Sequence, residues 1–166
     1  SRDGISHVLK NIVNSSKPRK TDKYGHDLSD NEIAQKILVA VDGSVSSMRA
    51  LNYVNYVMKE SSNIKVYLTH IIEWSDDEES MDEEMTVKME QDGRKMLLGI
   101  SLPSKLKNYE RIVKLGDPAK KISELASSLN ADTIVMGRKG LSDTDSNLGH
   151  VTTKVLSLTS KPVVLV

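Results

Sequence analysis

The stretch GDPAKKISELASSLNADTIVMGRKG, residues 116–140, contains the alternation of elements that decides the fold. It begins with a turn and places Pro118 near the first position of a helix, where a missing backbone N–H is not needed. Apolar residues at helical spacing then predict one buried helix face, and the apolar run DTIVM predicts a buried strand. The helix face consists of Ile122, Leu125, Ala126 and Leu129. A glycine-containing loop follows the strand.

The same alternation recurs on both sides of this stretch. Short apolar runs rich in β-branched residues predict four more strands, and segments with an apolar helical face lie between them. The expected strands are residues 36–41, 64–72, 109–115 and 162–166, and the expected helices are residues 44–60, 81–100 and 151–160. Strands that alternate with helices form a parallel sheet that is covered on both faces. We therefore expect an α/β domain with an open, five-stranded parallel sheet over residues 36–166.

The first 35 residues differ from the rest of the chain. A polar segment with Pro18 and Gly25 follows apolar residues at helical spacing, which predicts a short amphipathic helix and then a linker. This arm packs onto the domain or onto a partner, or it is mobile. We favour packing as an added helix, because an exposed apolar face is costly. The apolar residues are Ile5, Val8, Leu9, Ile12 and Val13.

The composition excludes several classes of protein. Lys and Arg total 23 and Asp and Glu total 23, so the chain lacks the basic excess of a nucleic-acid or anionic-membrane binder. It contains no apolar run near the roughly 20 residues of a spanning helix, and its N-terminus lacks the apolar core of a secretory signal. The absence of cysteine removes disulfides, thiol nucleophiles and thiolate zinc sites. We expect a cytoplasmic protein.

Ligands of open parallel sheets bind at the carboxyl ends of the strands, which here directs attention to the loops after Val41, Ile72 and Met136. The last of these loops has the pattern G-x2-G-x8-G, lies directly after a strand and ends where a helix begins. Glycines let backbone N–H groups approach an anion closely, and a helix N-terminus adds a favourable dipole. The loop therefore binds an anion or is an ordinary connection. The side chains able to donate are those of His150, Thr152 and Thr153.

The remaining candidates are weaker. Asp42 accepts hydrogen bonds from a ribose hydroxyl, or it serves helix entry beside Ser44, a good N-cap residue. Seven acids lie within residues 76–84 without the spaced ligands and turn glycine of a calcium loop, so they favour a solvated segment. The four histidines show no metal-binding spacing, and His70 at a strand end is typical of a satisfied, buried residue. Met81, Met85, Met89 and Met96 form a helical stripe that favours core packing over partner binding.

Several catalytic and nucleotide motifs are absent from the sequence. It contains no G-x4-G-K-[ST], no G-x-G-x-x-G and no G-x-S-x-G. We therefore assign no catalytic and no metal-binding residue.

Taken in order, KILVAVDGS, VYLTHII, GDPAKKISELASSLNADTIVMGRKG, GHVTTKV and KPVVLV resemble the universal stress protein family. The resemblance covers residues 36–166 and implies a Rossmann-like sheet and a homodimer with the last strand, Val163 to Val166, at its interface. One branch of the family binds ATP through G-x2-G-x9-G-[ST] after the fourth strand, and another branch lacks the motif and does not. The present loop is one residue shorter and has His150 where serine or threonine is usual.

The resemblance also implies a set of binding residues. Asp42 resembles the carboxylate on the ribose or adenine side, and Ile71 resembles the residue whose backbone holds adenine. Asp143 and Asp145 would face outward or be bridged by Mg²⁺, and Arg138 and Lys139 offset them in charge. The complete set is Ala40, Val41, Asp42, Ser44, Ile71, Met136, Gly137, Arg138, Gly140, Gly149, His150, Val151 and Thr152.

Three functional hypotheses follow. The first is a homodimeric stress-response or regulatory protein that binds ATP, ADP or AMP, with or without Mg²⁺. The second is a dimeric signalling or structural module of the same fold that binds no nucleotide. The third, an enzyme that is a slow ATPase or a nucleotidyl transferase, is the weakest, because no residue stands out as a base that positions water.

Overall fold

The computed structural model describes residues 35–58, 63–75, 82–102, 104, 106, 108–141 and 148–166. The expected N-terminal helix and linker lie outside the described residues. So do residues 76–81 of the acidic run and residues 142–147 of the glycine loop.

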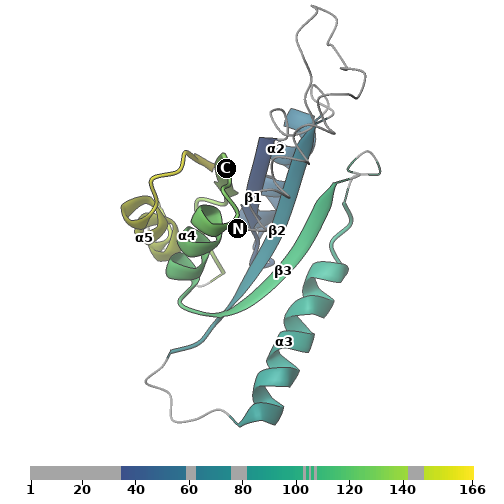
Figure 1. Ribbon diagram of the computed structural model, residues 1–166, viewed down its shortest axis with the longest axis vertical. Coiled ribbons are helices and arrows are strands. Elements are labelled where there is room, and N and C mark those ends of the chain that lie inside the picture. Colours follow the sequence, from purple (N-terminus) through teal and green to yellow (C-terminus); the bar gives the residue numbers. More distant parts are fainter. Residues whose placement is uncertain are drawn as a thin grey trace, which may run out of the picture. The chain divides into compact units, whose positions relative to one another are not determined.

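Strands and helices alternate along the described chain, as Figure 1 shows. The elements are β1 (Gln35–Ala40), α2 (Val45–Met58), β2 (Ile64–Glu73), α3 (Glu83–Leu98), β3 (Tyr109–Gly116), α4 (Pro118–Ser128), β4 (Thr133–Met136), α5 (His150–Leu158) and β5 (Val163–Leu165). The five strands form one sheet in the order β3-β2-β1-β4-β5, and every pairing is parallel. The predicted fold class is confirmed. Expected bounds differ from the observed ones by one or two residues at most element ends.

The central strand β1 lies between two neighbours that follow it at very different distances in sequence. Ala40 pairs with Thr69 of β2 on one side and with Met136 of β4 on the other. The chain first builds outward through β2 and β3, then crosses back to add β4 and β5. The carboxyl ends of β1, β2 and β4 therefore meet at the point where the strand order reverses, which is the usual ligand position in such sheets.

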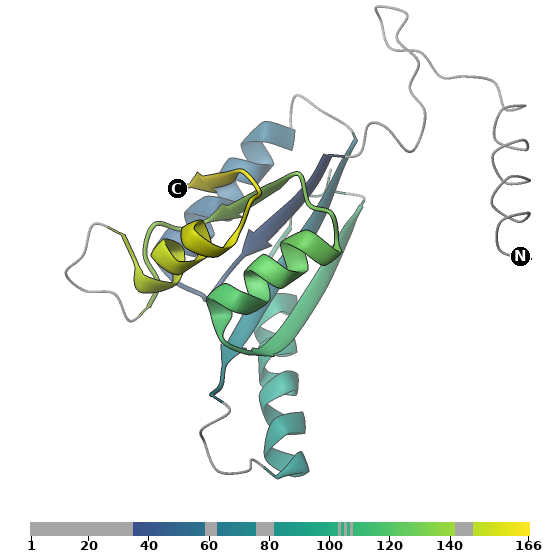
Figure 2. The same ribbon diagram turned by 60° about the vertical axis from the view of Figure 1, so that its left-hand side comes forward.

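Helices cover both faces of the sheet. Figure 2 shows α4 and α5 in front of the sheet and α2 and α3 behind it. One buried cluster lies under α2 and α3 and includes Val39, Val66 and Leu97; a second lies under α4 and α5 and includes Leu38 and Ile134. Alternate residues of β1 thus face opposite clusters, as the two-residue repeat of a strand requires. None of the described helices is long and apolar enough to cross a membrane.

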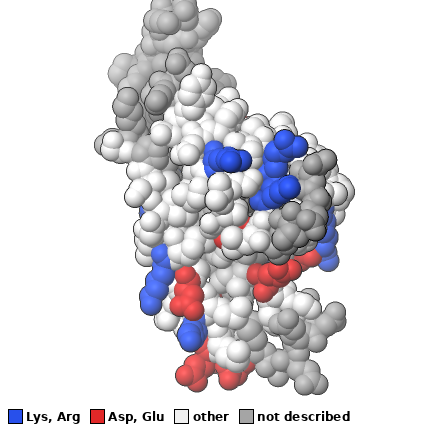
Figure 3. Space-filling view, turned by 180° about the vertical axis from the view of Figure 1, so that it is seen from behind, with Lys and Arg blue, Asp and Glu red and all other residues white. Residues whose placement is uncertain are grey.

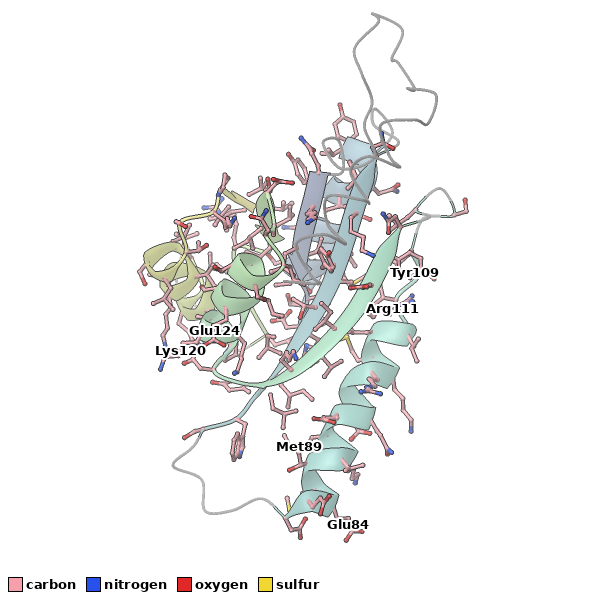
Figure 4. All side chains as sticks on the ribbon, in the orientation of Figure 1. Glu84, Met89, Tyr109, Arg111, Lys120 and Glu124 are labelled. Atoms are coloured by element: carbon pink, nitrogen blue, oxygen red, sulfur yellow. The ribbon has the colours of Figure 1, made fainter. Side chains whose placement is uncertain are left out.

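The helix α3 is fixed to the sheet at its carboxyl end. Arg111 of β3, labelled in Figure 4, donates from Nε to the Leu97 carbonyl at 3.1 Å and from Nη2 to the Ile100 carbonyl at 3.4 Å. The Leu97 carbonyl also accepts the Ile100 N–H at 3.2 Å, so the guanidinium is a further donor that ties the end of the helix to β3. Met96 packs against the core whereas Met85 is 54% exposed, so the expectation that the methionine stripe is core is wrong for Met85.

Candidate functional site

A cavity of ≈ 360 Å³ opens at the carboxyl ends of β1, β2 and β4. It lies where the sheet topology predicts a ligand site, and its outer wall comes from the first turns of α4 and α5. The predicted binding residues that line it are Ala40, Val41, Asp42, Ile71, Met136, Gly137, Gly140, His150, Val151 and Thr152. Ser44, Arg138 and Gly149 lie next to it and do not line it.

Asp42 connects the loop after β1 with the loop after β4. Its Oδ1 accepts the Ser44 N–H at 2.9 Å, and its Oδ2 accepts the Leu141 N–H at 3.1 Å. Burial raises the pKa of the Asp42 carboxyl, but the hydrogen bonds from Ser44, Leu141 and Ser47 outweigh burial and hold the pKa below its ordinary value. The carboxylate therefore serves helix entry and also orders the glycine loop.

Ser44 caps α2, as its position in the sequence predicts. Its Oγ accepts the Ser47 N–H at 3.1 Å, and its carbonyl accepts the Ser47 hydroxyl at 3.0 Å. Both groups are buried. A ligand-binding role for Ser44 stays a prediction, because the observed contacts of its side chain are those of an N-cap.

The base of the glycine loop is closed by two hydrogen bonds. The Gly149 N–H donates to the Arg138 carbonyl at 2.7 Å, and the Thr152 hydroxyl donates to the Gly137 carbonyl at 3.0 Å. Thr152 is 2% exposed. The end of β4 and the start of α5 are therefore tied together at the base of the glycine loop.

The two threonine hydroxyls at this helix start are used inside the protein. Thr152 donates to Gly137 as described, and the Thr153 hydroxyl donates to the Gly149 carbonyl at 3.0 Å. The structure thus differs from the expectation that these hydroxyls face an anion, because each carries only one hydrogen to donate. The N–H groups of Val151 and Thr152 in this first turn have no acceptor within the helix, as at any helix start, and suit an anion.

Gly137 has a packing reason for being glycine. A Cβ placed on it would lie 2.6 Å from Ser46 Oγ and 2.7 Å from the Ser46 carbonyl carbon. Real Cβ atoms do not approach backbone atoms so closely, so the chain leaving β4 passes against the first turn of α2 only because Gly137 has no side chain.

Two histidines line the cavity. His70 Nδ1 lies 2.8 Å from the Val41 carbonyl oxygen, which confirms that His70 is hydrogen-bonded, although its side chain is half-buried rather than fully buried. His150 is the exposed first residue of α5.

Sequence reasoning missed several lining residues. Pro118 and Ile122 of α4 form part of the wall of the cavity. The turn between β3 and α4 could have indicated them, because β3 also ends at this edge of the sheet. The other missed residues are Ser47, Thr69, His70, Ile72, Glu73, Lys139 and Leu141. Most lie within three residues of a strand end, so the strand bounds alone would have found them.

A second cavity, of ≈ 520 Å³, adjoins the first through Lys139 and Gly140, which line both. Its other lining residues include Ser44, Arg49 and Arg138. Figure 3, seen from behind, shows only Lys and Arg among the charged side chains of the upper part, and a mixture of acidic and basic side chains lower down. The positive charge beside the glycine loop favours an anionic ligand there.

Within the described part of the chain, no three His, Asp or Glu side chains come together as a metal site. Protein side chains of that part therefore do not form a dedicated cage for Mg²⁺, which in any case binds many sites through phosphate oxygens and water.

Comparison with known proteins gives one consistent result. Residues 34–166 match the model of the universal stress protein family. No curated protein sequence matches the chain.

Solved structures share the fold. The hypothetical protein MJ0577 is 27% identical, with a TM-score of 0.72 over 81% of this chain and 96% of its own. A universal stress protein in complex with cAMP is 23% identical, with a TM-score of 0.53 over 81% of this chain and 98% of its own. The universal stress protein from Archaeoglobus fulgidus in complex with dAMP is 20% identical, with a TM-score of 0.53 over 80% and 98%.

Proposed function

Because this chain belongs to the universal stress protein family, we propose that it binds an adenine nucleotide in the cavity at the carboxyl edge of the sheet. The ligand is ATP, ADP or AMP, and the protein acts as a homodimeric regulator in a stress response. The nucleotide-binding domain begins at Gln35, the first residue of β1 and one residue before the expected start, and residues 1–34 form a separate arm. A cytoplasmic location belongs to the same proposal.

The observation that carries the proposal is the fixed base of the glycine loop. The hydrogen bonds from Gly149 to Arg138 and from Thr152 to Gly137 hold the ends of the loop beside the first turn of α5. Backbone N–H groups there meet the positive end of a helix dipole, a combination that suits phosphate. Lys139 adds a positive charge at the rim of the cavity.

The residues on the other side of the cavity suit a nucleoside. Asp42 is half-buried and ionised at neutral pH, so its oxygens accept hydrogen bonds from ribose hydroxyl groups. Ala40, Val41 and Ile71 give the cavity an apolar wall for a base. Two structural neighbours were solved with cAMP and dAMP, which makes an adenine mononucleotide the first ligand to test.

The shortened loop and His150 are compatible with this proposal. His150 is exposed at the start of α5 and lines the cavity, so its ring N–H replaces the hydroxyl donor of serine or threonine. Mg²⁺, where the nucleotide carries it, binds mainly to phosphate oxygens and water.

The homodimer of the proposal forms through β5 and the residue after it. Val163, Val164, Leu165 and Val166 are half-exposed, and β5 is an edge strand that pairs only with β4 among the described residues. An apolar strand edge favours pairing with a second copy.

The alternative is a dimeric signalling or structural module that binds no nucleotide, and Asp42 provides its support. Both carboxylate oxygens already accept backbone N–H groups, so a ribose must share or displace them. A slow ATPase is the least favoured, because none of the described lining residues is held as a base for water.

The test is calorimetry with AMP, ADP and ATP, each with and without Mg²⁺, together with mass spectrometry of nucleotide that co-purifies with the protein. We expect micromolar binding that Gly140→Val abolishes, since Gly140 lines the cavity and valine adds bulk at that position. The control is Gly99→Val at the end of α3, remote from the cavity. Absence of binding by all three nucleotides to folded protein would favour the non-binding module.

A further inference from the structure

The hydrogen-bond ladder between β1 and β2 ends one bond earlier than it could if the pairing continued to Val41 and Ile71. The last pair in register is Ala40 with Thr69, and the Val41 N–H still donates to the Thr69 carbonyl at 2.9 Å. In a regular parallel ladder the next bond would run from the Ile71 N–H to the Val41 carbonyl. That bond is absent from the described backbone hydrogen bonds.

The Val41 carbonyl has another partner. His70 Nδ1 lies 2.8 Å from this oxygen, and a carbonyl oxygen only accepts, so Nδ1 carries the hydrogen and donates. The Val41 carbonyl, which has two lone pairs, is thus bonded by the imidazole and not by the Ile71 N–H.

The backbone of Ile71 is left facing the cavity. Alternate residues of β2 bond to opposite neighbours: Val66 donates to β3 at Asn108, whereas Thr69 accepts from Val41 on the β1 side. By this alternation the N–H and C=O of Ile71 point toward the β1 side, beyond the last ladder bond. Ile71 lines the cavity and is 8% exposed, so its polar edge is sheltered from bulk water.

We propose that His70 is a positioning residue for nucleobase recognition, because its imidazole caps the Val41 carbonyl and keeps the Ile71 N–H and C=O open for a base. A donor and an acceptor side by side match adenine, which presents a ring nitrogen acceptor beside an amino donor. The inference rests on the proposed nucleotide binding for its ligand, but the cap itself is a property of the ligand-free protein.

The first experiment measures amide hydrogen exchange of Ile71 by NMR in ligand-free protein. In His70→Val the side chain has no donor, so the Val41 carbonyl becomes available to the Ile71 N–H. One additional backbone hydrogen bond slows exchange of that amide about fivefold relative to the wild type. His70→Asn is the matched control, since its amide nitrogen occupies the position of Nδ1 and donates to the same carbonyl; its Ile71 amide exchanges as in the wild type.

The second experiment measures AMP affinity of the same three proteins. In His70→Val the Ile71 N–H bonds to the Val41 carbonyl in most molecules, and a base binds only the molecules in which this bond is open. The apparent affinity for AMP therefore falls by the same factor as the exchange rate, about fivefold. Ribose 5-phosphate, which lacks the base, should bind all three equally. A structural role of His70 elsewhere would alter both ligands together.

The outcomes separate this inference from the proposed function. Slower Ile71 exchange in His70→Val with a matching loss of AMP affinity supports the inference. Equal Ile71 exchange in His70→Val and the wild type overturns it, as does slower exchange with unchanged AMP affinity. If the wild type binds no AMP but the exchange difference is present, the role of His70 in keeping the Ile71 N–H unbonded is supported and the proposed nucleotide binding is refuted.

Discussion

The hydroxyl of Thr152 offers the sharpest test of how the glycine loop is held. Thr152→Val removes this hydroxyl and keeps the shape of the side chain. Thr152 is 2% exposed, and its hydroxyl donates to the Gly137 carbonyl at 3.0 Å. The substitution loses one hydrogen bond and leaves a buried carbonyl without this donor, which together amount to about 1–3 kcal/mol of stability.

The matched control is Thr153→Val, one residue along the same helix. The Thr153 hydroxyl donates to the Gly149 carbonyl over the same distance, 3.0 Å, but the residue is exposed and water replaces the lost donor. We expect a loss of at most about 0.5 kcal/mol, as for surface substitutions in general.

The assay is urea denaturation of the wild type and both variants, followed by circular dichroism. The free energy of unfolding should fall clearly for Thr152→Val and little for Thr153→Val, with an unchanged slope in urea. Equal losses in the two variants would refute the reasoning, because burial of the bond would then not matter. A stability of Thr152→Val equal to that of the wild type would mean that the hydroxyl does not hold the loop base.

Three further predictions concern packing, charge and assembly. Gly137→Ala should destabilise the protein by about 1–3 kcal/mol in urea because its Cβ meets backbone at 2.7 Å, whereas Gly99→Ala, with its nearest contact at 3.4 Å, should not. The hydrogen bond from Lys154 lowers the pKa of the Asp117 carboxyl. The carboxylate therefore stabilises the folded state at any pH above the ordinary pKa of Asp, and this stabilisation is lost as the pH falls through the lowered pKa of the folded state. Asp117→Asn, which still caps α4, should therefore cost up to about 1 kcal/mol at pH 7 and nothing in strong acid, in thermal unfolding at both pH values. Val164→Glu should elute as a monomer from a sizing column if β5 forms the dimer interface, and an unchanged elution volume would exclude that interface.

The fold could be read from the sequence because its signals are local. Apolar runs of strand length alternate with helical apolar faces, and each element needs only its own residues to be recognised. The turn at Pro118 and the cap at Ser44 are equally local, since each depends on the residues beside it. The order of the strands was not predicted and comes from the structure.

The candidate site was less accessible because its contacts join distant residues. The hydrogen bond between Asp42 and Leu141 spans 99 positions, and the close approach of Gly137 to Ser46 spans a similar distance. The sequence predicted that Asp42 and Gly137 lie near strand ends, but it did not predict which distant residues they contact. The cap of Val41 by His70 required the register of β1 against β2, which no local pattern contains.

The pairing of β1 with β4 has a consequence for how the domain is made. Lys36 at the start of β1 and Asp132 before β4 are joined by two hydrogen bonds across 96 positions. Such non-local pairing slows folding, because closing a long loop costs conformational entropy before the contact contributes any stability. A chain still under synthesis, or one truncated before β4, exposes one edge of an apolar strand and so presents an aggregation hazard. The cavity is lined from both β1 and β4, so it cannot form before this central pairing is complete.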